Sequence, residues 1–317
     1  MICVKELVKD FGGRVAVNGV SFELSKGDVL GFLGPNGAGK TTTMRMIVGF
    51  LPPTSGTAVV CGHNIVQDPI QARKRIGYMP ENAPLYGDMT VQTFLQFVAE
   101  IRRFIGKERD EKVDATIKKC FLQDVRHQTI ETLSKGYRQR TCFAQTMIHN
   151  PPVLILDEPT DGLDPNQKQL VRNMIQEMAA DKAIILSTHI LEEAEAICTR
   201  AIIISNGKVV TDSTPAELKK QAPSYNALTL KIVASAEEAK NTFEQLGDVD
   251  SVDVLDSSTD HVSLRLFPKN GQPLATTALE EAHSHNWLVK EMQSESGRLE
   301  EVFQHLTVTE NVSEKVK

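Results

Sequence analysis

Cysteine is scarce in this chain, and its few copies are scattered. The 317 residues include only five cysteines, none in a Cys-x-x-Cys arrangement: Cys3, Cys61, Cys120, Cys142 and Cys198. An odd number of widely spaced cysteines does not fit a disulfide framework, which needs pairs of cysteines. We therefore expect isolated thiols in a reducing cytosol, most of them packed as small apolar side chains.

Long hydrophobic runs are also missing. A transmembrane helix needs about 20 consecutive, mostly apolar residues, whereas the longest apolar runs here, such as Val153–Leu156 and Ala201–Ile204, have the length of strands. Charged residues interrupt the N-terminal segment MICVKELVKDFGG, which does not resemble a signal peptide. If the protein acts at a membrane, we expect another chain to supply the membrane-spanning part.

Basic residues are not in excess. The chain has 35 lysines and arginines against 41 aspartates and glutamates, which gives a formal net charge of -6. A surface that coats nucleic acid normally carries an excess of positive charge. The charge balance therefore argues against a nucleic-acid partner, and none is expected.

What is present is the composition of an ordinary globular protein. Hydrophobic residues make up 41% of the chain and charged residues 24%, which allows a sizeable core without disulfides. The length fits one large α/β domain with a smaller one appended. Compact apolar segments at Val29–Leu33, Val153–Leu156 and Ala183–Leu186 predict buried parallel strands, and polar residues, Asp157 and Ser187, follow the last two.

The pattern changes twice along the chain. Between about residues 82 and 150, helical periodicity replaces strand signals, over Val91–Phe104, Glu108–Leu122 and Ser134–Ile148. We predict a helical subdomain at about 82–150, inserted between strands of the main sheet of an N-terminal domain at residues 1–220.

A second change follows near residues 221–226, where Ala222, Pro223 and Ser224 suggest a linker. Beyond it, strand patterns at Ala227–Val233 and His261–Phe267 accompany helical patterns at Ala236–Leu246 and Pro273–His283. This order predicts a small α+β domain of ferredoxin-like type at residues 221–317, for which we consider a regulatory role.

A phosphate-binding loop is the clearest motif. The pattern G-x-x-x-x-G-K-[ST] follows an apolar strand and precedes a helical run, and we expect it to bind nucleotide through Gly34, Pro35, Asn36, Gly37, Ala38, Gly39, Lys40, Thr41 and Thr42. The glycines let successive backbone N–H groups point inward as an anion nest, and the following helix presents its positive end. Lys40 would reach the β- and γ-phosphates of ATP, and the Thr41 hydroxyl would ligate Mg²⁺.

A carboxylate pair follows a second buried strand. Asp157 and Glu158 end the run Val-Leu-Ile-Leu-Asp-Glu, so Asp157 would hold Mg²⁺ through water. Glu158 would accept a proton from the attacking water or orient it. The run continues as Pro-Thr-Asp-Gly-Leu-Asp-Pro. A motif of this length is much harder to obtain by chance than the carboxylate pair alone.

With these motifs in order, Ile2–Lys220 resembles an ATPase cassette of the ABC transporter family. The resemblance implies a P-loop α/β fold with a mixed sheet, an antiparallel β subdomain and a helical subdomain. It makes Glu158 the catalytic carboxylate and places His189, in Ser-Thr-His after another apolar strand, near the γ-phosphate. It also assigns Phe11 to stacking on adenine.

Two positions depart from the family pattern. The family signature begins Leu-Ser-Gly-Gly-Gln, whereas this chain keeps Ser134 and Gly136 but has Lys135 and Tyr137 at the other two places. The family resemblance implies that the kept residues contact the γ-phosphate held by a second cassette. Lys135 would assist anion binding or lie in solvent.

The second departure is Glu81, in Gly-Tyr-Met-Pro-Glu-Asn, where the family usually has the glutamine that ligates Mg²⁺ and relays nucleotide state to the transmembrane partner. A carboxylate can serve both purposes. This segment resembles ATPases of type-2 ABC exporters, such as those for gliding motility and multidrug export, and Ser296–Thr307 resembles their closing helix.

The resemblance implies an ATP- and Mg²⁺-dependent ATPase subunit of an exporter. It would form a homodimer of cassettes bound to transmembrane permease subunits at the cytoplasmic face of the inner (cell) membrane. One alternative is a soluble ABC ATPase that acts on the ribosome or DNA. Another is a regulatory module that binds ATP without hydrolysis, against which the intact Glu158 and His189 argue.

Overall fold

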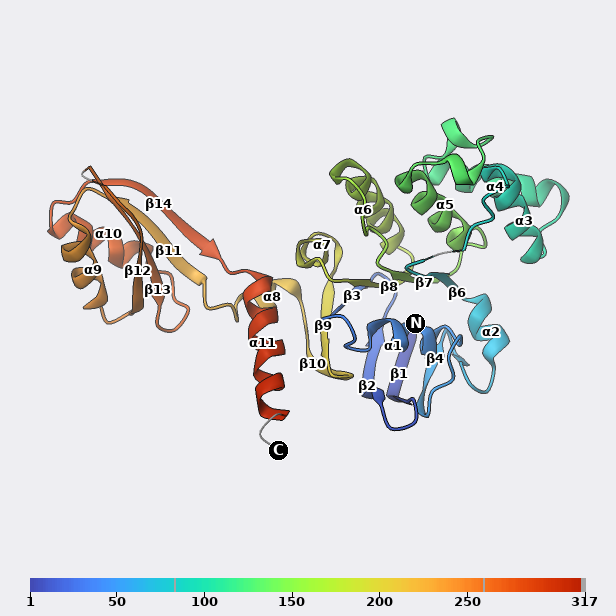
Figure 1. The fold of residues 1–317 in the computed structure, drawn as a ribbon, viewed down its shortest axis with the longest axis horizontal. Helices are drawn as coiled ribbons and strands as arrows, with labels where there is room; N and C mark the ends of the chain where they lie inside the picture. Colours follow the sequence, from blue (N-terminus) through green and yellow to red (C-terminus); the bar gives the residue numbers. More distant parts are fainter. Residues whose placement is uncertain (83, 259, 315–317) are drawn as a thin grey trace. The chain divides into compact units, whose positions relative to one another are not determined.

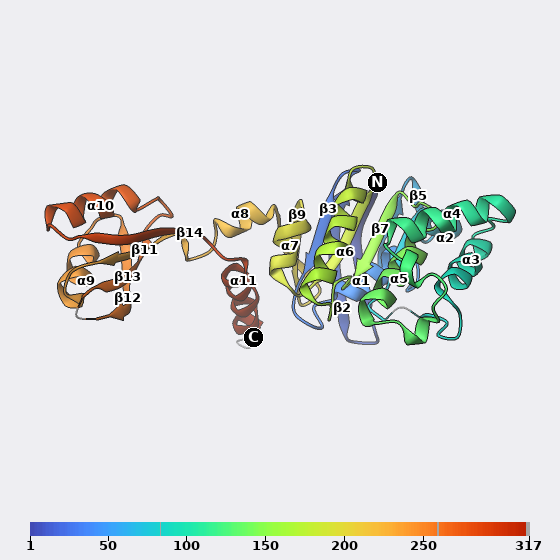
Figure 2. The ribbon, with the colours of Figure 1, turned by 90° about the horizontal axis from the view of Figure 1, so that it is seen from above.

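The computed structural model describes residues 1–82, 84–258 and 260–314, with the backbone alone from residue 307 on. Figures 1 and 2 show the ribbon from two directions. The chain divides into two units, Met1–Thr214 and Pro215–Lys317. This division falls a few residues before Lys220, where the sequence analysis places the boundary.

The central sheet of unit 1 has the strand order β10-β9-β3-β8-β7-β6 (Figure 1). Its strands are β3 (Val29–Leu33), β6 (Ile76–Met79), β7 (Val153–Asp157), β8 (Ala183–Thr188), β9 (Arg200–Ser205) and β10 (Lys208–Ser213). Neighbouring strands from β9 to β6 run parallel, and the edge strand β10 is antiparallel to β9. All residues of β3, β7 and β8 are buried, which confirms the parallel strands predicted from their apolar runs.

A second, antiparallel sheet has the order β2-β1-β4-β5 and consists of β1 (Ile2–Asp10), β2 (Val15–Leu24), β4 (Ser55–Val60) and β5 (His63–Asn64). One hydrophobic core joins the two sheets and includes Met44, Met46 and Ile47 of helix α1 (Lys40–Ile47). Helices α6 (Pro165–Ala179) and α7 (Leu191–Ile197) cover the other face of the central sheet (Figure 1). Because both faces are covered, the carboxyl ends of the parallel strands are held on a rigid base.

The helical subdomain predicted at about 82–150 is present, with Ala83 outside the described residues. It contains the helices α3 (Val91–Ile101), α4 (Gly106–Lys119) and α5 (Lys135–Met147) and the short 3-10 turns η1 (Gln123–Val125) and η2 (Ile130–Thr132), and α2 (Pro69–Lys74) precedes it. Thr90 and Thr93 form a capping box that starts α3. Among the described residues, no helix is both long and apolar enough to cross a membrane.

Unit 2 has the ferredoxin-like order of elements expected from the sequence. Short helix α8 (Pro215–Lys219) leads into β11 (Tyr225–Ile232), α9 (Ala236–Glu244), β12 (Val249–Ser257), β13 (Val262–Pro268), α10 (Ala275–Ser284), β14 (Val289–Ser296) and α11 (Leu299–Glu314). The sheet order is β12-β13-β11-β14, and all neighbouring pairs are antiparallel. Unit 2 has its own hydrophobic core, which includes Leu228, Leu230 and Phe243. We therefore expect it to fold independently.

Because each unit has its own core, residues 1–214 alone should bind ATP as tightly as the full chain. Equilibrium titration of the truncated chain with a fluorescent ATP analogue measures this, with Lys40→Ala in the same truncation as the control for specific binding. An insoluble or unfolded 1–214 fragment would show that unit 2 is needed for the fold of unit 1.

Candidate active site

The phosphate-binding loop joins β3 to α1, and its backbone demands glycine. Gly37 and Gly39 have φ values of 82° and 106°, in the left-handed region that favours glycine. A Cβ on Gly39 would lie 2.5 Å from the Ala16 carbonyl oxygen, and one on Gly34 would lie 2.4 Å from the Ile204 carbonyl oxygen. The α1 N-terminus has no side-chain cap, so its N–H groups remain available for an anion.

Lys40 lies within this loop. Its Nζ donates hydrogen bonds to the carbonyl oxygens of Gly34 at 2.6 Å and Pro35 at 3.2 Å. The residue is only 8% exposed. Burial lowers the Lys40 pKa, and the negative charges of Glu158, Asp157 and Glu81 act in the opposite direction. The loop therefore carries one cation in an anion-binding nest.

Asp157 ends β7 beside the loop and is 1% exposed. Its Oδ1 accepts hydrogen bonds from the Ser187 hydroxyl at 2.6 Å and the Thr41 hydroxyl at 3.3 Å. Its Oδ2 is buried and has no hydrogen-bond partner among the described residues. A buried, unsatisfied carboxylate oxygen next to a hydroxyl suits Mg²⁺, which prefers oxygen ligands.

In the part of the chain that the structure describes, no group of three or more His, Cys, Asp or Glu residues could hold a metal ion. Magnesium in nucleotide sites is usually held by one or two carboxylates together with substrate phosphates. The site around Asp157 and Thr41 fits this mode, in which the protein supplies part of the ligand set and the nucleotide the rest.

Glu158 and His189 lie together, although 31 positions separate them in the sequence. Glu158 Oε2 is 3.0 Å from His189 Nδ1, and the Glu158 backbone N–H donates to the Ser187 hydroxyl at 3.0 Å. Burial raises the Glu158 pKa, whereas His189 and Lys40 counteract this rise. A carboxylate with a raised pKa, oriented by an imidazole, is equipped to accept a proton.

The Glu158 backbone is itself unusual. Its φ is 50°, a left-handed conformation that costs a non-glycine residue about 1–3 kcal/mol and persists only where surrounding contacts enforce it. Strain of this kind clusters at functional sites.

Ser134 and Gly136 lie at the start of α5. The Ser134 side chain caps the helix and accepts a hydrogen bond from the Tyr137 N–H at 3.4 Å. Gly136 is buried, and a Cβ there would lie 2.8 Å from the Gln167 side-chain oxygen. Lys135 Nζ is 3.7 Å from Asp161 Oδ2. Lys135 and Gly136 therefore lie against the loop after β7 and the start of α6.

The remaining candidates, Phe11 and Glu81, are exposed. Phe11 lies in the turn between β1 and β2 with 54% of its surface exposed, and Lys9 Nζ is 5.2 Å from its ring centroid. An exposed ring suits stacking on a base. Glu81 follows β6, is exposed, and contributes to the electrostatic environment of Lys40.

Two buried polar residues near the site, Thr160 and Glu193, were not predicted from the sequence; they are 2% and 1% exposed. The Thr160 hydroxyl donates to Glu193 Oε2. A signal was available for Glu193, because Leu191, Ala194 and Ile197 mark the buried face of α7 and Glu193 is buried with them. A carboxylate on the apolar face of a helix usually has a specific partner.

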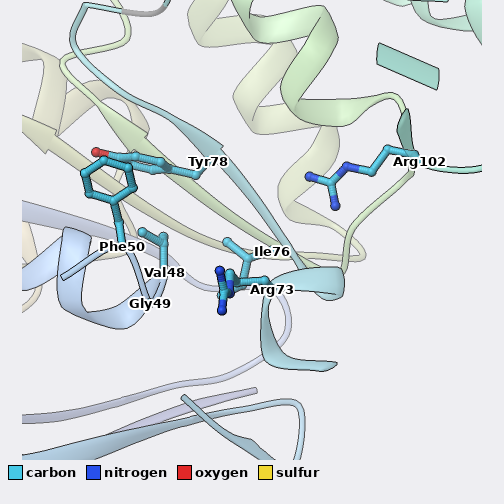
Figure 3. A pocket seen from close by; sticks show the side chains of 7 residues that line it. All are labelled: Val48, Gly49, Phe50, Arg73, Ile76, Tyr78 and Arg102. Carbon is cyan, nitrogen blue, oxygen red and sulfur yellow. The ribbon is translucent and has the colours of Figure 1, made fainter. Parts of the chain in front are cut away.

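A pocket of about 370 Å³ lies elsewhere in unit 1, between the end of α1, α2, β6 and the end of α3. Figure 3 shows the rings of Phe50 and Tyr78 on one side of it and the guanidinium group of Arg102 on the other. Arg73 contributes a second positive charge. Phe50 is 77% exposed, so the pocket combines an exposed aromatic ring with basic groups.

The loop, its lysine and the buried aspartate on a nearby parallel strand define a P-loop nucleotide hydrolase. A family model described as ABC transporter matches residues 17–161. The uncharacterized ABC transporter ATP-binding protein YhcH of Bacillus subtilis is 39% identical over 209 residues, which cover 65% of this chain and 68% of that protein. The probable multidrug ABC transporter ATP-binding protein YbhF of Escherichia coli is 35% identical over 223 residues, covering 70% of this chain and 38% of that protein.

The fold agrees with these matches. A solved structure of an ATP-binding subunit of an ABC transporter superposes with a TM-score of 0.64 at 28% identity, over 70% of this chain and 92% of that one. The chain belongs to the ABC transporter family. It is an ATP-binding, ATP-hydrolysing subunit, and the predicted cassette fold is confirmed.

Replacement of Lys40 by alanine should weaken ATP binding at least about tenfold, because a hydrogen bond to a charged group contributes about 1.5–3 kcal/mol. Isothermal titration of the full chain measures this, with Lys26→Ala, an exposed lysine before β3, as the matched control. Equal affinities for Lys40→Ala and the wild type would refute the loop assignment.

Proposed function

We propose that two copies of the chain close around two ATP molecules and power export by a transmembrane permease. Each composite site would use Lys40, Thr41, Asp157, Glu158 and His189 of one copy with Ser134 and Gly136 of the other. The main support is the convergence of the first five residues at the carboxyl ends of β3, β7 and β8 and the start of α1.

Within this proposal, the chain's own groups divide the chemistry. Glu158 takes the proton of the attacking water, and His189 holds its carboxylate in place through the 3.0 Å contact. Lys40 and the α1 N-terminus stabilise negative charge on the phosphates. Thr41, Asp157 and Glu81 would hold Mg²⁺, which supplies charge neutralisation when bound, and Phe11 would stack on adenine.

The signature residues support the second copy in this proposal. Lys135 and Gly136 contact Asp161 and Gln167 of their own chain, on the side of the loop that follows Glu158. The N-cap Ser134 places a hydroxyl at a helix N-terminus, a favourable site for phosphate. A second cassette that presents this helix end would complete the site, and loss of the γ-phosphate would release it.

The pocket beside Phe50 supports the permease part of the proposal. It lies in the same unit as the Glu81–Thr90 segment and the helical subdomain, for which we propose contact with the permease. Its aromatic and basic lining (Phe50, Tyr78, Arg73 and Arg102) would accept a short cytoplasmic helix with apolar and acidic side chains. The chain would thus work at the cytoplasmic face of the inner membrane, attached through its partner.

Export is the direction that one relative suggests, the Nod factor export ATP-binding protein I of Ralstonia nicotianae, which is 36% identical over 219 residues. The alternative of a soluble ATPase acting on the ribosome or DNA has no specific observation in its favour. The second unit would have a regulatory role, because its hydrophobic core contains none of the residues of the ATP site.

Replacement of Glu158 by glutamine should lower ATP turnover by about 10²–10⁴-fold, since the amide cannot accept the proton. The variant should accumulate as an ATP-bound dimer, because the bridging γ-phosphate persists. Phosphate release and size-exclusion chromatography with ATP measure the two effects, and Lys40→Ala should remain monomeric. Wild-type turnover by Glu158→Gln would rule out the proposed role of Glu158.

Arg73→Glu should reduce binding of the chain to membranes that contain its permease, because the pocket would repel an acidic helix. ATP affinity of the isolated chain should not change. Sedimentation with membranes from cells that express the permease measures the first effect. Lys107→Glu, a charge reversal at a side chain 91% exposed on α4, is the control; equal membrane binding by both variants would contradict the docking site.

A further inference from the structure

Glu193 of α7 is a buried carboxylate to which the proposed chemistry gives no role. It is 1% exposed and lies on the buried face of its helix with Leu191, Ala194 and Ile197. Burial of a charged carboxylate is costly unless cations and hydrogen-bond donors compensate it. Its partners therefore indicate what the residue does.

These partners come from three separate elements. Glu193 Oε2 accepts hydrogen bonds from the Thr160 hydroxyl and, at 3.4 Å, from the Thr188 hydroxyl. Glu193 Oε1 lies 3.0 Å from Lys168 Nζ and 3.9 Å from Arg172 Nη2, both on α6. We call Thr160, Lys168, Arg172, Thr188 and Glu193 the Glu193 cluster.

Two members of the cluster lie next to the proposed catalytic pair. Thr160 is two residues beyond Glu158, and Thr188 immediately precedes His189. The Thr188 hydroxyl also accepts a hydrogen bond from the Ile190 N–H at 3.0 Å. A hydroxyl can donate one hydrogen bond and accept others. Thr188 therefore links the residues on either side of His189, itself and Ile190, to Glu193.

The loops that carry Glu158 and His189 follow different strands, β7 and β8. The Glu193 carboxylate of α7 connects the two segments, because it accepts hydrogen bonds from both Thr160 and Thr188. Lys168 and Arg172 connect the same carboxylate to α6, which begins directly after residues 161–164. The strained φ of Glu158, 50°, needs surrounding contacts that enforce it. The hydrogen bond from Thr160, in the same loop, to Glu193 is one such contact.

We propose that Glu193 is a positioning residue that holds Glu158 against His189. The inference rests on the proposed catalytic roles of that pair. If the Thr160 bond is lost, the loop after β7 relaxes and the Glu158 carboxylate moves relative to the attacking water. A misplacement of about 1 Å can cost about 10²-fold in rate, whereas ATP binding, which uses the loop between β3 and α1, is untouched.

The test uses the full chain and compares kcat with ATP affinity. Thr160→Val removes the hydroxyl but keeps the shape, so kcat should fall about 10- to 100-fold while the ATP dissociation constant stays at the wild-type value. Thr160→Ser restores the donor and should recover most of the activity. Glu193→Gln should lower kcat in the same way, and Glu192→Gln, the exposed neighbour on α7, should behave as the wild type.

Two results for Thr160→Val would overturn the inference. Wild-type kcat for Thr160→Val means that the hydroxyl positions nothing. A parallel loss of ATP affinity in Thr160→Val means that the cluster supports the fold as a whole. If Glu193→Gln fails to fold, the Thr160 pair still decides the question. Wild-type turnover by Glu158→Gln would instead overturn the catalytic assignment, so the two failures are distinguishable.

Discussion

The hydrogen bond between Ser187 and Asp157 is the contact on which the rest of the site depends. β7 and β8 pair in parallel with Asp157 opposite Ser187, so the two side chains meet at the carboxyl ends of buried strands. Ser187 then donates to Asp157 and accepts from the Glu158 N–H, and Asp157 receives the Thr41 hydroxyl from α1. A shift in the register of β7 against β8 would separate Asp157 from Ser187 and move Glu158 relative to His189. The buried sheet thus fixes the positions of the short loops that carry Glu158 and His189.

The buried strands and the motifs at their ends could be predicted from local sequence patterns. The contacts between side chains far apart in the sequence could not. Apolar runs predicted β3, β7 and β8 because fully buried parallel strands are apolar throughout. Strands β12 and β14 gave no comparable signal, since edge strands carry charged residues such as Asp250, Asp253 and Lys290. The Glu158–His189 contact and the Glu193 cluster join distant positions, so spacing alone could not find them. Glu193 was detectable in principle, but its partners were not.

The departure at Lys135 also has a local explanation that only the structure supplies. A Cβ on Gly162 would collide with the Lys135 side chain, and the Lys135 ammonium pairs with Asp161 at 3.7 Å. The lysine therefore lies against the loop after β7, with 57% of its side chain exposed. Gly162, with a φ of 62°, leaves the space that the longer side chain needs. The signature segment and this loop thus form one surface, the surface that a second cassette would meet in the proposed dimer.

In the proposed dimer, electrostatics would favour closure only with nucleotide present. The negative charges of Glu158, Asp157 and Glu81 act on the Lys40 ammonium. A triphosphate that enters this environment adds further negative charge, which Lys40 alone cannot balance at short range. The α1 N-terminus, a divalent cation and the α5 N-terminus of a second copy would supply the missing positive potential. Without nucleotide, the α5 N-terminus of the second copy would have no γ-phosphate to contact. In the proposed dimer, closure would therefore follow from the affinity of both copies for the same γ-phosphate, and hydrolysis would remove the group that holds them together.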